Sequence, residues 1–361
     1  MIGSPRFDPT KIRIFFRITK FIINFAASMK KLIWYSMAVC LLTLCACGPS
    51  EADQKRAQRQ RQEADHKAYQ AAFKVGTLPT LDCLPLFLLR DSVLYDTTRA
   101  DIRLVGFTAQ MDCDTAMTGR SVNACVTDLV RAQRLQRKGV PIRWFASTNA
   151  YWNLYASKQL KVDSIGRLSD CNIAMTRYSI TDYLTAEVLQ RAKLQRPALR
   201  AQINDVLVRE KMATGGELDA FWFTEPMATK MRLDGHRLLY SSQKSGLHPG
   251  AIVLVEGSSD DPKRTMRQQE EFRKAYDRAV ALINKNGLVY YSDLIIKYMG
   301  VDSKVVMNLP KLSFEPARGP READLKAFQS PLFIHIKKEQ HLWTKRIASP
   351  ADSPSAASSS T

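Results

Sequence analysis

Polar side chains that can bind a small solute follow the first short apolar runs of this chain. Thr77, Thr80 and Asp82 come after the first run, beside a predicted helix start. Hydroxyls and free backbone N–H groups at a helix start can hold an anion. Asp82 is equally suited to capping that helix. Gln110 follows the next run, two residues before Asp112, which is predicted to cap a short helix. The loop that contains Thr77, Thr80 and Asp82 and the loop that contains Gln110 are both predicted to face a ligand.

Thr127 and Asp128 follow a third apolar run and begin the next predicted helix. They can bind a ligand or simply cap the helix. Asn149 lies where the chain leaves this series of strands, and a residue at such a crossing can act as a hinge without touching a ligand. Thr127, Asp128 and Asn149 are predicted to line the ligand site, with these structural roles as the alternatives.

The second half of the chain offers an arginine and a carboxylate. Arg177, Tyr178 and Ser179 follow one apolar run, and a guanidinium fork suits a carboxylate, sulfonate or phosphate. Ser179 begins a helix whose dipole favours an anion. The alternative is an exposed arginine followed by a helix cap. Glu225 follows a predicted buried run that includes the core residue Trp222. Its carboxylate suits a cationic amine. The alternative is a glutamate in the first turn of a helix.

These candidates do not agree on the charge of the ligand. Arg177 indicates an anion. Asp82, Asp128 and Glu225 indicate a cation. A zwitterion or a neutral heterocycle would use both kinds of side chain.

The apolar runs alternate with predicted helices, which is typical of βαβ units and a mostly parallel sheet. Strands are predicted at 74–76, 102–107, 122–126, 142–146, 151–157, 172–175, 218–223, 237–240 and 251–255. Helices are predicted at 84–89, 112–117, 129–137, 180–190, 206–213, 265–284 and 292–299. The chain crosses between two α/β lobes near Thr148 and near Ser245. Ligands of open α/β sheets bind beyond the carboxyl ends of the strands, so the cleft between the lobes is the predicted site.

Composition narrows the possible partners. The 361 residues suffice for about two to three domains, and the formal net charge is +18. Six of these charges belong to residues 1–46, and the rest are scattered without a run of five or six like charges. No nucleic-acid partner is therefore predicted.

Seven cysteines are present, and four of them lie in the body of the chain: Cys83, Cys113, Cys125 and Cys171. They form no CxxC pair and have no histidine cluster beside them, so neither a metal site nor a cofactor is predicted. They form disulfides if the compartment is oxidising, or they are small buried residues in apolar runs.

The amino terminus has the layout of an export signal. Met29-Lys30-Lys31 precedes an apolar stretch at 32–44, which is short for a membrane span. Leu44-Cys45-Ala46-Cys47 resembles a bacterial lipobox, which implies that Cys47 is lipidated and becomes the first mature residue. The alternative is an uncleaved anchor. On this interpretation Met29 is the true start, and residues 1–28 are a mis-called extension.

Several blocks together resemble the periplasmic solute-binding proteins of ABC importers, in the branch of alkanesulfonate-, nitrate- and thiamine-precursor-binding proteins. The blocks are VGTLPTLDCLPLFLL (75–89), NACVTD (123–128), ASTN (146–149), GELDA (216–220) and TEP (224–226). The resemblance covers about residues 73–300. Alanine is frequent in the family where Cys83, Cys113 and Cys125 stand, and the stretch after Asn308 has no counterpart there.

The resemblance implies an α/β, type II two-lobed fold with two crossovers. It implies a monomeric binding protein that closes on a small polar or anionic solute, such as a sulfonate or thiamine precursor, and delivers it to an ABC permease. With Cys47 as membrane anchor, the protein would lie on the periplasmic side of a bacterial envelope. The expected divisions are 1–28 (extension), 29–46 (signal), 47–72 (polar tether), 73–150 with 245–335 (lobe 1), 151–244 (lobe 2) and 336–361 (disordered tail).

Two other functions are compatible with this fold. One is an enzyme resembling those of thiamine or menaquinone synthesis, because a fold does not fix a function. The sequence has no Ser-His-Asp order, metal-ligand spacing or phosphate loop, so the prediction is that the protein is not an enzyme. The other is a tethered sensor without transport.

Overall fold

The structure is a computed structural model that describes residues 29, 34, 36, 51–257 and 261–328. Residues 1–28, most of the predicted signal, Cys47 and the predicted tail 336–361 lie outside the described residues. The chain divides into two compact units, Met1–Gln70 and Ala71–Thr361. No helix among the described residues has the length and apolar content needed to cross a bilayer.

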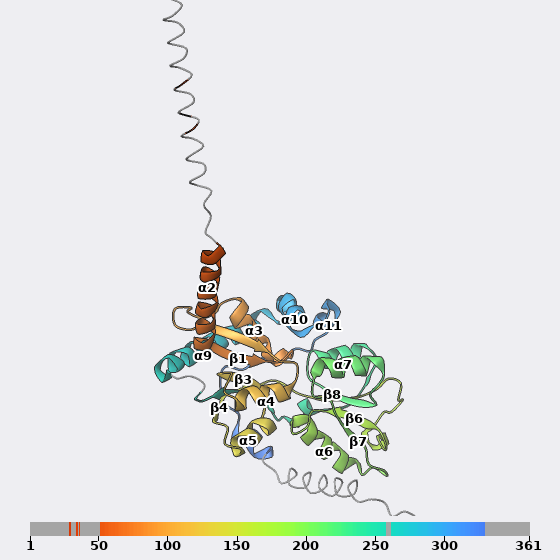
Figure 1. Cartoon of the computed structure of the whole chain (residues 1–361). Coiled ribbons are helices and arrows are strands. Elements are labelled where there is room, and N and C mark those ends of the chain that lie inside the picture. The colour runs from red at the N-terminus through yellow and green to blue at the C-terminus, as the bar shows by residue number, and fades with distance from the viewer. Residues whose placement is uncertain (1–28, 30–33, 35, 37–50, 258–260, 329–361) are drawn as a thin grey trace, which may run out of the picture. The chain divides into compact units, whose positions relative to one another are not determined.

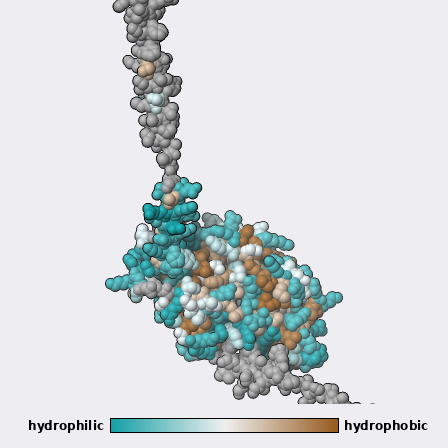
Figure 2. Space-filling view, viewed as in Figure 1, coloured by the Kyte–Doolittle hydropathy of each residue, from teal (hydrophilic) through white to brown (hydrophobic). Residues whose placement is uncertain are grey.

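Helix α2 (Glu51–Ala71) makes up most of the described part of the first unit. Its 21 residues are rich in Gln, Arg, Ala and Asp, and none of them is buried. Figure 2 shows mainly hydrophilic side chains along it. Glu51 and Asp53 in its first turn suit the positive end of the helix dipole. The residues of the predicted polar tether that are described are thus helical and exposed.

Two five-stranded sheets form the centre of the second unit (Figure 1). The first sheet, with its helices, is called lobe 1, and its strand order is β2–β1–β3–β10–β4. These strands span Ile102–Gly106, Phe73–Thr77, Ala124–Asp128, Gly250–Val255 and Ile142–Thr148. β1 is parallel to β2 and β3, whereas β10 is antiparallel to β3 and β4. β1, β3 and β10 are buried along their whole length, as expected of central strands covered on both faces.

The second sheet, with its helices, is called lobe 2. Its strand order is β7–β6–β8–β5–β9, and these strands span Leu199–Gln202, Asn172–Met175, Ala220–Phe223, Asn153–Ala156 and Arg237–Ser241. β6 is parallel to β7 and β8, and β5 is antiparallel to β8 and β9. The chain therefore crosses between the lobes twice, between β4 and β5 and between β9 and β10.

Helices cover both sheets. In lobe 1 these are α3 (Leu84–Asp91), α4 (Gln110–Thr118), α5 (Leu129–Arg137), α9 (Pro262–Asn286), α10 (Ser292–Met299) and α11 (Ser303–Met307). In lobe 2 they are α6 (Ile180–Ala192), α7 (Val206–Gly215) and α8 (Met227–Leu233). A last helix, α12 (Glu322–Ala327), ends the described chain at the junction of the lobes.

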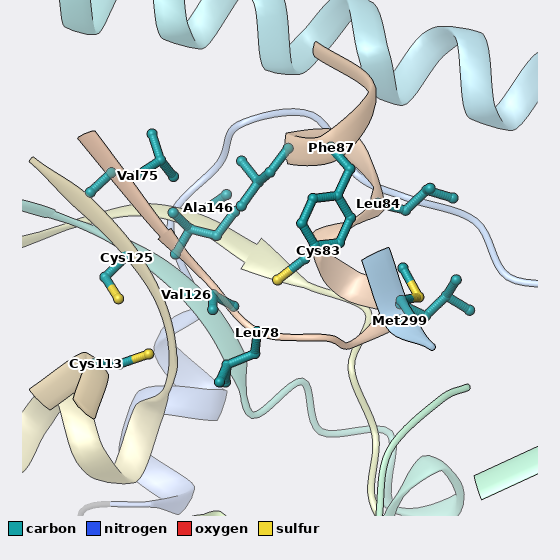
Figure 3. Close-up of a cluster of buried hydrophobic side chains, with 14 of the residues drawn as sticks. Val75, Leu78, Cys83, Leu84, Phe87, Cys113, Cys125, Val126, Ala146 and Met299 are labelled. Atoms are coloured by element: carbon teal, nitrogen blue, oxygen red, sulfur yellow. The ribbon is translucent and has the colours of Figure 1, made fainter. Parts of the chain in front are cut away.

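The core of lobe 1 lies between β1, β3 and the helices above and below them. Figure 3 shows Val75 and Cys125 on these strands, with Leu84 and Phe87 of α3 to one side and Cys113 of α4 to the other. All five side chains are buried. The thiols of Cys83, Cys113, Cys125 and Cys171 are free and buried, as the alternative of small buried residues predicts.

Two local predictions differ from the structure. Asp112 does not cap a helix: α4 begins at Gln110, with Ala109 at the cap position, and Asp112 lies in the first turn. β7 was not predicted, because this edge strand is largely exposed and its sequence, LRAQ, has no apolar alternation. Residues 308–320 contain no helix or strand, and they lead into α12.

Candidate functional site

The strand ends of lobe 1 meet along one edge of its sheet. Thr77 pairs with Gly106 at the ends of β1 and β2. Gly250, at the start of β10, pairs with Asp128 on one side and Thr148 on the other. The carboxyl ends of β1, β2, β3 and β4 therefore share this edge, which is the usual ligand edge of an α/β sheet.

Lobe 2 repeats the arrangement. Met175 of β6 pairs with Gln202 at the end of β7, and β8 runs parallel to β6. Thr176 and Thr224 come directly after β6 and β8. The polar loops of this lobe thus also gather at one sheet edge.

A cavity of about 40 Å³ lies where these two edges face each other. Its lining comes from both lobes and includes apolar and polar residues. The apolar residues are Leu78, Val126, Trp152, Val206, Trp222 and Phe223. The polar residues are Thr80, Asp82, Gln110, Thr127, Thr176, Thr181, Arg209 and Thr224. The volume suffices for about three water molecules, so the lobes must separate to admit anything larger.

The lobes are closed in this structure, and hydrogen bonds join them beside the cavity. The Thr108 hydroxyl donates to Asp205 Oδ2 at 2.5 Å, and Val206 N–H donates to the Thr108 carbonyl at 2.9 Å. Arg131 Nη1 donates to the Arg177 carbonyl at 3.1 Å. The guanidinium of Arg131 is itself fixed by both carboxylate oxygens of Asp114, which orients it for this contact.

Arg209 brings a guanidinium into the cavity wall. It lies in the first turns of α7 and is 3% exposed. Nε donates to the Ile203 carbonyl at 3.0 Å, Nη1 to the Trp222 carbonyl at 2.9 Å and Nη2 to the Thr176 hydroxyl at 2.5 Å. These neutral acceptors hold the side chain in place but leave its charge uncompensated.

The charge of Arg209 is therefore costly in the absence of an anion. Its guanidinium makes no ion pair with any carboxylate in the described part of the chain. Burial lowers the pKa of Arg209 to about 10, and the more distant Asp205 opposes this only in part. A buried cation that lacks a direct counter-charge is stabilised when an anion binds beside it.

Asp82 is the one carboxylate among the described residues that line the cavity. Burial raises its pKa, while hydrogen bonds from Thr80 and Thr148 act in the opposite direction. The Thr148 hydroxyl donates to Asp82 Oδ2 at 3.1 Å. The Thr127 hydroxyl is buried and has no hydrogen-bond partner among the residues that the structure describes. The cavity thus has a fixed cation, a carboxyl whose pKa is raised by burial and an unused hydroxyl.

Four of the predicted ligand-binding residues line this cavity: Thr80, Asp82, Gln110 and Thr127. All four come from lobe 1, and the structure brings them together as the strand-end argument predicts. Their binding of a solute remains a prediction.

The other candidates from lobe 1 and its crossing lie outside the cavity lining. The Thr77 carbonyl accepts the Phe107 N–H at 2.8 Å at the end of the sheet. Asp128 is fully buried and caps α5, since it accepts the Arg131 N–H at 2.9 Å. Asn149 Nδ2 donates to the Ser313 carbonyl at 2.7 Å at the first crossing. The cap formed by Asp128 is the structural role that the sequence left as its alternative.

The candidates from lobe 2 stand next to cavity residues but do not line it. The Arg177 guanidinium lies over the Tyr178 ring, 4.7 Å from its centre. Ser179 caps α6 and accepts the Thr181 N–H at 3.1 Å. Glu225 accepts hydrogen bonds from the Tyr151 hydroxyl at 2.9 Å and the Thr229 N–H at 3.0 Å, and burial raises its pKa.

The sequence does not single out the polar residues that lobe 2 contributes to the cavity. Thr176 and Thr224 each precede a predicted candidate by one position. Arg209 lies within a helix rather than in a strand-end loop, and it shares a helical face with Val206 and the buried Ala213. A cation on the apolar face of a short helix was the signal that could have identified it.

The described residues contain no group of three or more His, Cys, Asp or Glu side chains that could hold a metal ion.

Solved structures of two-lobed binding proteins share this fold. The alkanesulfonate-binding protein SsuA from Xanthomonas axonopodis pv. citri, bound to MOPS, is 20% identical, with a TM-score of 0.58 over 72% of this chain and 90% of that one. The ligand-binding component of an ABC-type import system from Staphylococcus aureus, with zinc bound, is 14% identical, with a TM-score of 0.59 over 75% and 92%. The periplasmic nitrate-binding protein NrtA from Synechocystis PCC 6803 is 10% identical, with a TM-score of 0.56 over 70% and 74%.

These similarities, all at low identity, define the class of fold. The chain has the type II two-lobed fold of periplasmic solute-binding proteins, as its sequence motifs predict, and its structural neighbours come from the alkanesulfonate and nitrate branch. No protein-family model matches the chain, and no curated protein sequence does.

Proposed function

We propose that this protein is the substrate-binding component of an ABC importer, which closes its two lobes on a small anionic solute and delivers it to a permease. The fold supports the general role. The observation that carries the anionic preference is Arg209, a buried guanidinium in the cavity wall without a carboxylate partner among the described residues.

A sulfonate or nitrate suits this site better than a cationic thiamine precursor. The threonine hydroxyls of the cavity can donate to oxyanion oxygens, and protonation of Asp82 would remove the one negative charge of the lining. Structural neighbours that are binding proteins of importers favour a binding protein over an enzyme.

The amino-terminal segment completes the proposal. Cys47 carries the lipid, and the signal occupies residues 29–46, after residues 1–28. The segment 47–72 tethers the body to the periplasmic side of a bacterial membrane. Lobe 1 comprises 73–150 and 245–335, lobe 2 comprises 151–244, and the protein acts as a monomer. Helix α2, with no buried residue, is suited to a solvated tether.

Isothermal titration of the full chain in detergent micelles tests the preference for anions. Ethanesulfonate and nitrate serve as anionic probes and choline as a cationic one. The proposal predicts binding of at least one anion and no binding of choline. Arg209→Met should weaken anion binding about tenfold to a hundredfold, because a hydrogen bond to a charged group is lost.

Lys211→Met is the matched control, since Lys211 lies on the exposed side of the same helix. It should leave the affinity unchanged. Binding of choline in preference to the anions, or equal affinities of Arg209→Met and wild type for a bound anion, would rule the proposal out.

A further inference from the structure

The chain beyond α11 runs back across both crossings between the lobes. Residues 308–328, called the C-terminal strap, comprise an extended stretch followed by α12. This is the stretch for which the sequence motifs offered no counterpart. Its hydrogen bonds show which parts of the molecule it joins.

The middle of the strap is fixed to lobe 1. Phe314 is buried in the lobe 1 core, and its N–H and C=O bond the side-chain amide of Asn284 at 2.9 and 2.8 Å. Ala317 N–H donates to Asp277 Oδ1 at 2.7 Å on the same helix, α9. Ser147 N–H of β4 donates to the Arg318 carbonyl at 2.7 Å. These bonds make residues 313–318 part of lobe 1.

Asp324 then ties the strap to the second crossing. It is fully buried, it pairs with both Nε and Nη2 of Arg321 at 2.7 and 2.8 Å, and it accepts the His248 N–H at 3.1 Å. Arg321 also donates to the Gly246 carbonyl at 2.7 Å. A buried carboxylate with these partners fixes α12 against the hinge.

Both ends of the strap contact lobe 2. At its start, Arg232 of α8 donates to the Asn308 carbonyl at 2.9 Å. At its end, Tyr183 of α6 donates to the Ala327 carbonyl at 3.3 Å and packs edge-to-face on Phe328, with ring centres 5.3 Å apart. Between these residues, Gln133 of α5 in lobe 1 donates to the Leu325 carbonyl at 3.0 Å. Helix α12 therefore bonds to one helix of each lobe.

A cavity of about 220 Å³ lies beneath the strap, where it passes the crossings. Tyr151, His248, Lys311 and Ser313 are among the residues that line it. The strap thus passes over a cavity at the hinge, and it is attached on either side by these hydrogen bonds and by the packing of Phe314 and Phe328.

We propose that the C-terminal strap is a third connection between the lobes, which favours the closed state, and that Asp324 is its positioning residue. A hinge formed by two crossings opens by backbone rotation within them. Opening would also separate α5 from α6, and α12 cannot keep its bonds to both. The strap contacts that exist only in the closed state shift the equilibrium toward it. This inference does not depend on which solute binds.

Hydrogen exchange of the Val206 amide reports closure directly, because this N–H, at the first turn of α7, bonds only across the cleft to the Thr108 carbonyl in the structure. In the full chain without added solute, Asp324→Ala should raise its exchange rate about tenfold, measured by NMR. The amides of central strand β10, such as Ile252, should exchange at the wild-type rate.

Glu322→Ala is the matched control, since Glu322 lies on the same helix with its side chain 79% exposed. It should change neither rate. Tyr183→Phe removes one bond to the strap and keeps the ring contact, and it should raise Val206 exchange about threefold even if Asp324→Ala does not fold. Unchanged Val206 exchange in the folded variants, or an equal rise at Ile252, would overturn the proposal.

Discussion

At the scale of single residues, the cleft combines groups that are costly to bury with few partners to compensate them. Arg209 keeps its charge among neutral acceptors, and Asp128 is a fully buried carboxyl. Such groups are expected where a closed conformation must meet a ligand or a second lobe.

Asp128 predicts a specific pH dependence of stability. Burial raises its pKa to about 7, although Arg131 opposes the shift. The folded state therefore binds more protons than the unfolded state between about pH 4 and pH 7, and stability should fall as the pH rises through this range and level off above it. Asp128→Asn keeps a capping side chain and should flatten this fall, as measured by urea unfolding at pH 5 and pH 8.

The control for this prediction is Asp302→Asn, at another helix cap whose residue is exposed. It should show the wild-type dependence on pH. An Asp128→Asn protein whose stability still falls between pH 5 and pH 8 as steeply as that of the wild type would show that the pH dependence arises elsewhere.

The unpartnered hydroxyl of Thr127 predicts that its removal raises the stability of the protein and weakens solute binding. A buried hydroxyl without a partner costs about 1 to 3 kcal/mol. Thr127→Val should therefore raise the free energy of unfolding by about 1 kcal/mol in chemical denaturation and weaken solute binding in calorimetry. Thr176→Val serves as the contrast: it removes an acceptor of Arg209 and should lower stability. A destabilised Thr127→Val protein would contradict the prediction.

At the scale of elements, close packing of β1 against β3 depends on one glycine. A Cβ at Gly76 would lie 2.6 Å from Cys125 Sγ and 3.1 Å from the Phe107 ring. Gly76→Ala should lower the free energy of unfolding by about 1 to 3 kcal/mol through overpacking, as measured by urea titration. Gly106→Ala, at the paired end of β2, meets no atom within 4 Å and should be nearly neutral. Equal effects of the two substitutions would show that packing around Cys125 is not the cause.

The sequence predicts most of these elements because their signals are local. Alternating apolar runs and helix starts identify β1, β3 and α5, and strand-end loops lead to Thr80, Asp82 and Thr127. Strand-end loops do not identify Arg209, because it lies within a helix. Tertiary packing determines which face of α7 meets the cavity. Local patterns do not predict the contacts of the strap either, because its bonds to α5, α6 and the hinge join residues far apart in the chain.

At the scale of the whole molecule, the proposed anchor predicts a covalent change at Cys47. The coding sequence from Met29 to the end, expressed in Escherichia coli, should yield a protein that incorporates labelled palmitate and fractionates with membranes. Cys47→Ser should abolish incorporation because the acylated thiol is lost, whereas Cys45→Ser should not. Labelling that persists in Cys47→Ser would assign the lipid to another residue.

Closure on an anion is the central claim, and the position of a bound sulfonate tests it most directly. A crystal of the protein with ethanesulfonate, measured at a long wavelength, locates the sulfur by its anomalous scattering. The proposed function predicts a sulfur peak between the two lobes, within hydrogen-bonding reach of Arg209 through the sulfonate oxygens. A fully occupied sulfur site away from this cavity, with the lobes closed and Arg209 untouched, would contradict it.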